Sequence, residues 1–132
     1  MSERIYVAAS FEQKDEVKAL HKQLQAAGHT ITVDWTTHKE IVSLESEEER
    51  EALKRQYATE DTNGIISASV YVLLLGSRKS TGAHIELGIA LGAQIPRIYL
   101  IGKVDVSQLF YSHPSITTVP TIDAFMHMLG DG

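Results

Sequence analysis

An unbroken apolar run at Val70–Leu75 places the strongest constraint on how this chain can fold. Its residues are all valine, leucine or tyrosine, with no polar residue alternating among them, so the run predicts a strand that is buried on both faces. Ile5–Ala9 and Arg97–Ile101 have largely the same character and are also predicted strands. Strands of this kind belong to a parallel sheet that is covered by helices on each side.

Helical patterns separate these strands. Apolar residues recur at helical spacing over residues 12–27, where Gly28 supplies a stop. Ser46 and Glu49 fit a capping box that starts a long helix reaching Thr62 or beyond. Weaker signals complete the pattern: strands at 30–34 and 116–119, a loop at 35–44, a helix at 82–93 and a closing helix at 122–129. We therefore predict an α/β fold with three layers, a parallel sheet of about five strands and helices on both faces, formed as a single domain over residues 1–132.

Composition narrows the functional classes. The 132 residues include no cysteine, which excludes disulfides, thiolate catalysis and cysteine-ligated zinc. The net charge of −5, with no basic cluster, disfavours nucleic acid and anionic membrane surfaces as partners. The longest apolar stretches are too short to span a bilayer, and residues 1–4 lead directly into the first strand without a secretory signal. We therefore expect a cytoplasmic protein.

A single carboxylate, Glu86, interrupts the apolar, small-residue segment 82–93. Burying an unpaired ionised carboxylate costs several kcal/mol, so this acid needs a compensating partner, and a ligand or a reaction is one candidate. Its neighbours at helical spacing are mostly small and leave room for another group: Gly82, Ala83, Ile89 and Ala90. A closely packed second helix with an arginine on Glu86 is the structural alternative, and both stay open at this point.

The predicted topology brings three loops to the carboxyl edge of the sheet, where ligands bind in folds of this class: 9–13, 76–82 and the loop after Ile101. Glu86 lies in the early turns of the helix that leaves the second loop. A helix N-terminus favours a nearby anion, so we expect Glu86 to be ionised and to act as a nucleophile rather than as an acid. The donors of the turn Ser80–Gly82 are suited to a phosphate or a sugar hydroxyl.

Asp61, near the end of the long predicted helix, is a second candidate. An acid at a helix C-terminus opposes the helix dipole, so it does not serve helix stability. Glycosidic bond cleavage commonly divides the chemistry between two carboxylates, which makes Asp61 a candidate proton donor for Glu86; a solvated acid or a local cap is the alternative. The six histidines show no metal-ligand spacing, and Walker and GxGxxG loops are absent, so we expect no metal and no cofactor.

Three segments together resemble one enzyme family. Ile5–Ser10, Glu60–Ile65 and Gly82–Gly88, with Pro96 beyond, look like the corresponding parts of the nucleoside 2-deoxyribosyltransferases and of the similar 2'-deoxynucleoside 5'-phosphate N-hydrolases. The resemblance runs in order along nearly the whole chain and is weakest at 35–44. It implies a flavodoxin-like Rossmannoid fold and cleavage of N-glycosidic bonds without a metal or an organic cofactor.

The resemblance also implies roles for individual residues. Glu86 takes the place of the nucleophile that attacks the anomeric carbon, Asp61 that of the acid/base that protonates the leaving base, and Tyr6 that of a tyrosine that hydrogen-bonds the nucleophile. A glycosyl-enzyme ester would then be resolved by water or by a second base, with net retention. From loop position, Phe11 and Trp35 are expected to line the base site.

One position bears on the substrate. Transferases that act on free nucleosides usually carry aspartate six residues before the nucleophile, whereas the phosphate-specific hydrolases carry serine, and here the residue is Ser80. Ser10 matches a serine in the first loop of the hydrolases, and Arg78 and Lys79 add positive charge. Glu12 stands where the hydrolases have an arginine and would repel phosphate if it pointed inward. We therefore expect the substrate to be a nucleoside 5'-monophosphate.

Three alternatives stay open: base exchange on free deoxynucleosides by a transferase, a non-catalytic nucleotide-sensing module, and, more remotely, hydrolysis of a dinucleotide such as NAD. Besides a small nucleoside or nucleotide, the expected partners are further copies of the chain. Members of the resembled family assemble as dimers or larger homo-oligomers with shared active sites. The loop at Tyr111, Ser112 and His113 is the segment expected to reach a neighbouring subunit.

Overall fold

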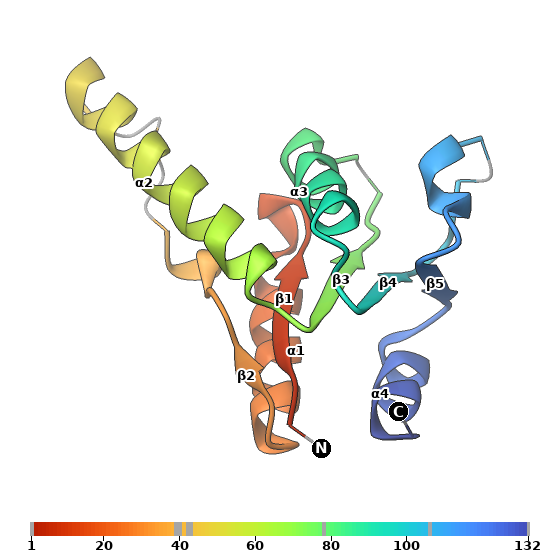
Figure 1. The fold of residues 1–132 in the computed structure, drawn as a ribbon. Coiled ribbons are helices and arrows are strands. Elements are labelled where there is room, and N and C mark those ends of the chain that lie inside the picture. The colour runs from red at the N-terminus through yellow and green to blue at the C-terminus, as the bar shows by residue number, and fades with distance from the viewer. Residues whose placement is uncertain (1, 39–40, 42–43, 78, 106, 132) are drawn as a thin grey trace.

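The computed structural model of the chain describes residues 2–38, 41, 44–77, 79–105 and 107–131. Five strands form one parallel sheet in the spatial order β2-β1-β3-β4-β5 (Figure 1). The strands are β1 (Arg4–Ala8), β2 (Thr30–Ile31), β3 (Val70–Leu74), β4 (Arg97–Ile101) and β5 (Ile116–Val119). The helices are α1 (Lys14–Ala26), α2 (Glu47–Ile66), α3 (Thr81–Gly92) and α4 (Ile122–Asp131), with short 3-10 turns η1 (Phe11–Gln13), η2 (Trp35–Thr37) and η4 (Leu109–Ser112).

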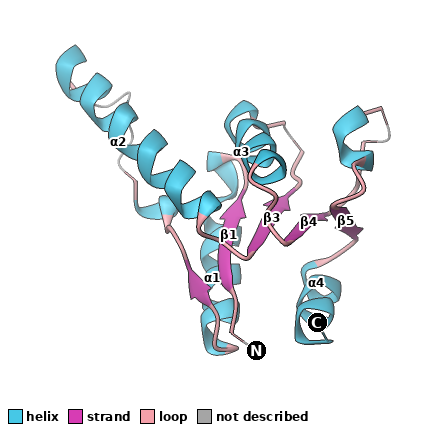
Figure 2. Ribbon diagram, in the orientation of Figure 1, coloured by secondary structure: helices cyan, strands magenta, loops and turns pink. Residues whose placement is uncertain are grey.

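Helices cover both faces of this sheet (Figure 2). Tyr71 of β3 faces α3, because its hydroxyl donates to the carbonyl oxygen of Ala83 at 3.0 Å. Tyr99 of β4 points to the opposite face, where its ring packs edge-on against Phe125 of α4 with 5.1 Å between centroids. α2 packs against α3, and α1 lies behind β1 in the view of Figure 1. The predicted three-layer α/β fold with about five parallel strands is therefore confirmed.

The central strands form the core, as their unbroken apolar runs predict. Every residue of β3 is buried, and in β1 and β4 only the first residue is not. Tyr6 and Tyr71 pair across β1 and β3, with nearly parallel rings whose centroids lie 6.0 Å apart. Large aromatic side chains contribute much of the buried area in a core, and their hydroxyl groups need a polar partner there. Both hydroxyls find that partner on α3.

Serine caps begin both helices that border the site. Ser46 accepts a hydrogen bond from the backbone of Glu49 at 3.3 Å, and Ser80 accepts one from the backbone of Ala83 at 3.2 Å. Ser46 thus caps α2 at the predicted start, through the serine half of the predicted capping box. The helix continues to Ile66, so Asp61 lies within its final turns and not at its end.

The predicted strand at 30–34 is too long. Only Thr30–Ile31 pair with β1, and the chain then turns into η2 inside the predicted loop. The cause is Asp34, whose carboxylate accepts the backbone N–H of Thr36 at 3.1 Å and so caps η2 instead of extending the strand.

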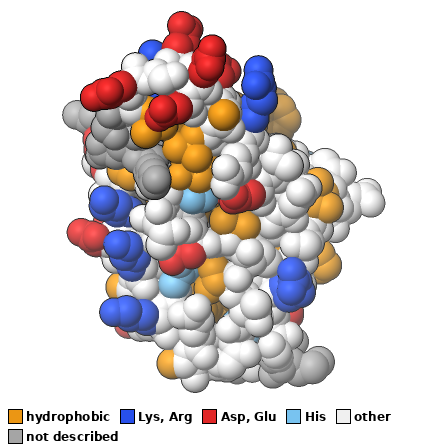
Figure 3. Space-filling model, turned by 90° about the vertical axis from the view of Figure 1, so that its left-hand side faces the viewer, with side chains coloured by type: hydrophobic (Ala, Val, Ile, Leu, Met, Phe, Trp, Pro, Cys, Tyr) orange, Lys and Arg blue, Asp and Glu red, His pale blue; other side chains and the backbone are white. Residues whose placement is uncertain are grey.

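Charge is spread unevenly over the surface. Three glutamates, Glu47, Glu48 and Glu49, occupy the first turn of α2, where the helix dipole favours anions. Figure 3 shows acidic side chains gathered at the upper end of one face, with lysine and arginine side chains interspersed among other types below them. Across the described ranges, no helix combines the length and apolar character that crossing a bilayer requires.

Gly64 allows α2 to approach the chain that follows β2. A Cβ atom at this position would overlap Cγ2 of Val33 and lie 3.2 Å from Oγ1 of Thr32. A glycine inside a helix costs roughly 0.5–1 kcal/mol relative to alanine. The close approach that it permits offsets this cost, which explains why α2 runs through a residue that otherwise favours a helix end.

Replacing Gly64→Ala should therefore lower the free energy of unfolding by about 1–3 kcal/mol, because overpacking against Val33 outweighs the gain in helix propensity. Gly88→Ala in α3 is the matched control, since a Cβ there meets nothing within 4 Å. That change should be neutral or stabilising by up to about 1 kcal/mol. Urea unfolding measures both, and equal effects of the two changes would contradict the close approach at Gly64.

Candidate active site

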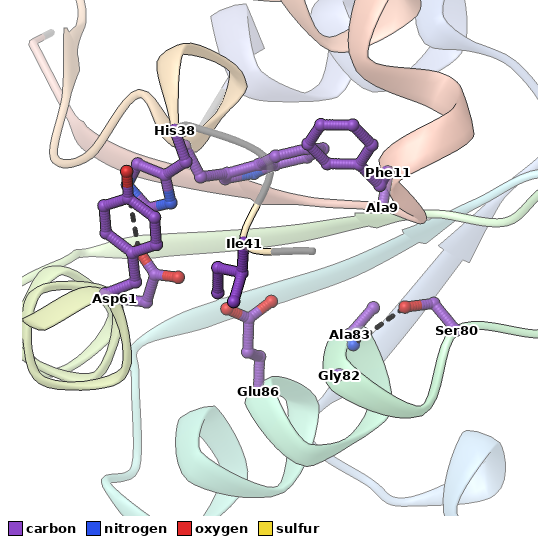
Figure 4. Close-up of a pocket in the computed structure, with 11 residues that line it drawn as sticks. Ala9, Phe11, His38, Ile41, Asp61, Ser80, Gly82, Ala83 and Glu86 are labelled. Atoms are coloured by element: carbon purple, nitrogen blue, oxygen red, sulfur yellow. Dashed lines mark hydrogen bonds and ion pairs between the residues drawn. The ribbon is translucent and has the colours of Figure 1, made fainter. Parts of the chain in front are cut away.

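A cavity of about 480 Å³ opens beyond the carboxyl ends of β1 and β3, a size suited to a small-molecule ligand. Figure 4 shows side chains from η1, the η2 segment, α2 and α3 converging on it. Most of the residues singled out from the sequence line this cavity: Phe11, Trp35, Asp61, Ser80, Gly82 and Glu86. Tyr6 lies behind Glu86, and Ser10 lines a neighbouring cavity.

Asp61 and Glu86 both point into this cavity, from α2 and α3 respectively (Figure 4). The packing of these two helices brings together acids that lie far apart in the sequence. Burial raises the pKa of Glu86 to about 7, and the negative charge of Asp61 adds to the rise. Burial also raises the pKa of Asp61, to about 6. Each of the two carboxyl groups can therefore take up or release a proton near neutral pH.

The expectation that the helix dipole keeps Glu86 ionised is wrong. Its pKa lies above the ordinary value and not below it, because removal from water outweighs the dipole. Glu86 stands in the second turn of α3, and the dipole effect falls off within the first turn. At neutral pH the Glu86 carboxyl group is therefore divided between its two protonation states.

Tyr6 stabilises the anionic form of Glu86. Its hydroxyl donates to Oε2 of Glu86 at 2.6 Å, which lowers the pKa of that carboxyl and so opposes burial. Burial and the negative charges of Glu86 and Asp61 raise the pKa of Tyr6 far above its ordinary range, so the phenol keeps its proton. The hydrogen bond between Tyr6 and Glu86 that the resemblance implied is therefore present. A catalytic role for Tyr6 stays a prediction.

Trp35 and Phe11 form an aromatic wall of the cavity. Their ring centroids lie 6.4 Å apart with an interplanar angle of 40°. Trp35 is buried and its indole N–H donates to the carbonyl oxygen of Val7 at 2.6 Å, so it also anchors η2 to β1. Phe11 is 45% exposed beside the cavity, which leaves a ring face available to a planar ligand.

His38, Ile41 and Tyr57 also line the cavity, and none of them was predicted from the sequence. The His38 ring stacks on Tyr57 with centroids 3.7 Å apart and planes 4° from parallel. Its Nε2 lies 3.9 Å from Oδ1 of Asp61. Tyr57 and Asp61 are one helical turn apart on α2, a spacing that could have identified Tyr57. His38 lies in an irregular segment, where no periodicity identifies a cavity residue.

Histidine and acidic side chains do not gather into a metal centre in the part of the chain that the structure describes. No three of the described histidine, aspartate and glutamate residues are grouped so as to hold a metal ion. Nε2 of His38 and Oδ1 of Asp61 lie 3.9 Å apart and form a pair, not a group of three.

A smaller cavity of about 210 Å³ adjoins the first, and Ser80 and Ala83 line both. The three loops that were predicted to meet at the carboxyl edge all contribute to its lining. Ser10 lines only this smaller cavity, where its N–H and Oγ both lie within hydrogen-bond distance of Oε1 of Gln13. Ser80 therefore stands at the boundary between the carboxylates and Ser10.

The charges around the smaller cavity are partly balanced. Lys79 pairs with Asp105 at 3.1 Å, and hydrogen bonds from Ser107 and Lys79 lower the pKa of Asp105 to about 2. Lys103 also lines this cavity. Glu12, on η1, lines neither cavity, so the inward orientation that would repel phosphate is not observed. Arg78 lies outside the described residues.

Tyr111, which was predicted to reach a neighbouring subunit, is bound within its own chain. Its hydroxyl lies 2.5 Å from Nε2 of His84, and Nδ1 of the same ring lies 2.7 Å from the carbonyl oxygen of Ser80. Because a carbonyl only accepts, Nδ1 carries the proton and Tyr111 donates to Nε2. The adjacent Leu109 and Phe110 are 76% and 61% exposed and remain available to another chain.

Comparison with known proteins identifies relatives of the fold. No protein-family model matches the sequence, and no curated protein sequence matches it significantly. The solved structure of the CMP N-glycosidase BcmB from Clostridium botulinum is similar, with a TM-score of 0.66 at 16% identity over 96% of this chain and 98% of that chain. A 2-deoxyribosyltransferase from Bacillus psychrosaccharolyticus is similar with a TM-score of 0.68 at 21% identity, over 92% of this chain and 89% of that chain. The chain therefore shares their fold over nearly its whole length.

Replacing Glu86→Gln should raise the free energy of unfolding by about 2–3 kcal/mol at pH 8 and leave it nearly unchanged at pH 4. The folded-state pKa of about 7 exceeds the ordinary 4.5, so the contribution of this carboxyl to stability is complete below pH 4.5 and is lost as the pH rises through 7. Glutamine cannot ionise, and it keeps an acceptor for Tyr6.

Urea unfolding at both pH values measures this difference. Glu16→Gln, an exposed position on α1, is the control and should show no gain at pH 8. Equal gains at pH 4 and pH 8 for Glu86→Gln would show that burial of charge is not the cause.

Proposed function

We propose that the protein is an N-glycosidase that hydrolyses the bond between base and sugar in nucleoside 5'-monophosphates. The observation that carries this proposal is the convergence of two partly buried carboxylates, Glu86 and Asp61, on one cavity of about 480 Å³. A pair of carboxylates beside a glycosidic bond is the usual equipment of glycosidases. The fold likeness supports the same reaction class, since the two similar structures are a CMP N-glycosidase and a 2-deoxyribosyltransferase.

Glu86 is the nucleophile in this proposal. Its carboxylate attacks the anomeric carbon while the bond to the base breaks, and the electron pair of that bond leaves with the base. Tyr6 holds Oε2 of Glu86 at 2.6 Å, which directs Oε1 to the sugar. Positive charge develops on the sugar in the transition state and favours the ionised form of Glu86.

Asp61 is the acid and then the base. It gives a proton to the departing base, and afterwards it takes a proton from the water that hydrolyses the glycosyl ester, which restores both carboxyl groups to their starting states. Its pKa of about 6 leaves a useful protonated fraction near neutral pH. Repulsion between like charges favours one proton on the pair, and the higher pKa of Glu86 places it there in the free enzyme. A basic nitrogen of the substrate that accepts a hydrogen bond from Asp61 moves this proton to Asp61 and leaves Glu86 ionised.

The smaller cavity is the proposed site of the 5'-phosphate. Ser80 joins it to the carboxylates, and Ser10, Lys79 and Lys103 contribute hydroxyl and ammonium donors. Asp105 offsets part of the charge on Lys79, so recognition also depends on the hydroxyls and on the N-terminus of α3. A serine at position 80 in place of an aspartate removes an anion that would repel phosphate.

A transferase that exchanges bases on free nucleosides is the second candidate, favoured by the fold likeness to the 2-deoxyribosyltransferase. It would use the same two carboxylates, with a second base in place of water. In either case we expect further copies of the chain to associate, and exposed Leu109 and Phe110, beside Tyr111 of the smaller cavity, are the side chains best placed to contact them.

Release of free base from a panel of ribo- and deoxyribonucleosides and their 5'-monophosphates, followed by chromatography, tests this proposal. Each substrate is incubated with and without an acceptor base. We expect release from monophosphates without acceptor, reduced by at least about 10³-fold in Glu86→Gln and unchanged in Glu16→Gln. Release only with acceptor would indicate the transferase, and binding without turnover would indicate a sensing module.

Tyr6→Phe should shift the acidic limb of the pH profile of kcat/KM upward by about one pH unit, because Glu86 loses the hydrogen bond that favours its ionised form. Tyr71→Phe is the matched control, since its hydroxyl donates to the carbonyl oxygen of Ala83 and not to Glu86. An identical shift in both variants would indicate a general effect of losing a core hydroxyl.

A further inference from the structure

His38 stands between two hollows of the molecule. It lines the main cavity, and it also lines an open groove on the surface between the chain after β2 and α2. Among the residues that line these two hollows, His38 is common to both. One side of its ring is therefore near the carboxylates, and another is within reach of solvent.

The orientation of the His38 ring is held by Tyr57. The two rings stack nearly parallel, with centroids 3.7 Å apart, and the His38 side chain is only 16% exposed. Tyr57 and Asp61 lie one turn apart on α2, so the residue that supports the imidazole and the acid that it faces belong to one rigid element. Figure 4 shows His38 above Asp61 at one end of the cavity.

Oδ1 of Asp61 is a buried acceptor that no hydrogen bond satisfies within the described part of the chain. The ring nitrogen that faces it is Nε2 of His38, at 3.9 Å. Catalytic hydrogen bonds are often long in free enzymes and tighten when a substrate is bound. The positive field of His38 already lowers the pKa of Asp61, against the larger effect of burial.

We propose that His38 is a positioning residue for Asp61: its Nε2–H closes on Oδ1 as the acid gives up its proton. This inference rests on the proposed function, in which Asp61 protonates the departing base. The proton passes from Oδ2 to a base nitrogen, the electron pair of the broken bond stays on the base, and the resulting carboxylate charge is met at Oδ1 by His38. Because Oδ1 faces the imidazole, Oδ2 is the oxygen left for the substrate.

Other charged groups lie around His38 and Asp61 and also affect the charge of the Asp61 carboxyl group. Glu60 lies beside Asp61 on α2 and raises its pKa, and Asp34 lines the outer groove ahead of η2. Glu86 on α3 faces the cavity from the other side, with Tyr6 of β1 behind it. Among these described groups His38 is the one that can carry positive charge beside the carboxylate formed at Asp61.

Two variants distinguish the effect of the His38 N–H donor from the effect of its aromatic ring. His38→Phe keeps an aromatic ring that can stack on Tyr57 but removes the N–H, and His38→Gln keeps an N–H donor at a similar reach but removes the ring. We expect kcat for a nucleoside 5'-monophosphate to fall about tenfold or more in His38→Phe and only a few-fold in His38→Gln, with KM little changed. In a double-mutant cycle, His38→Phe should add little to Asp61→Asn.

A leaving group that needs no proton sharpens the test. The 5'-monophosphate of 7-methylguanosine carries a cationic base, which departs without protonation, so His38→Phe should approach wild-type kcat on this substrate. Two outcomes would overturn the inference and leave His38 as a wall of the cavity. One is that His38→Phe lowers kcat equally on both substrates. The other is that the Phe and Gln variants have equal kcat values on the ordinary substrate.

A readout without turnover distinguishes this inference from the proposed function. The pKa of Asp61, followed through its carboxyl carbon by NMR, should rise in His38→Phe and rise less in His38→Gln. Absence of base release by the wild type would sink the proposed function. An unchanged pKa of Asp61 in both variants would sink the assignment of His38.

Discussion

The packing of α2 against α3, beyond the carboxyl end of β1, is the contact on which the site depends. It withdraws Asp61 and Glu86 from water together, and this shared burial raises both pKa values toward neutrality. Two exposed carboxyl groups at the same positions in the sequence would both be ionised, and neither would hold a proton to give. The acid/base character of the pair therefore comes from helix packing and not from either residue alone.

Burial of these two carboxyl groups lowers the free energy of unfolding, and the apolar packing of the sheet offsets this cost. β3 is buried along its whole length, and β1 and β4 nearly so, which anchors both helices to a core of apolar and aromatic side chains. Tyr6 belongs to that core and to the site at once, because its ring stacks on Tyr71 while its hydroxyl meets Glu86. The core thus positions the carboxylate as well as stabilising the fold.

Much of the fold was predictable because its signals are local. Unbroken apolar runs identified β1, β3 and β4, and a serine cap identified the start of α2. Glu86 could be singled out because a lone acid in an apolar helix conflicts with its surroundings. The length of β2 was not predictable in the same way, since Asp34 ends it through a side-chain bond that has no periodic pattern.

The site was only partly predictable, for a related reason. The pKa of Glu86 follows from how deeply two helices enclose it, and the place of His38 follows from stacking on a residue of another element. The bond between the Tyr111 hydroxyl and His84 was likewise not predicted, because it joins two segments that lie far apart in the sequence. Spacing along a chain reports which residues share a face, but not which faces meet.

The two tyrosine hydroxyls that join the sheet to α3 have a mechanical consequence. Tyr6 reaches Glu86 and Tyr71 reaches the carbonyl oxygen of Ala83, one helical turn apart. Sliding or rotating α3 over the sheet would break both bonds and expose buried residues of the core. α3 is thus a fixed floor for the cavity, and Trp35, whose indole N–H is bound to the carbonyl oxygen of Val7, ties the η2 wall to the same sheet.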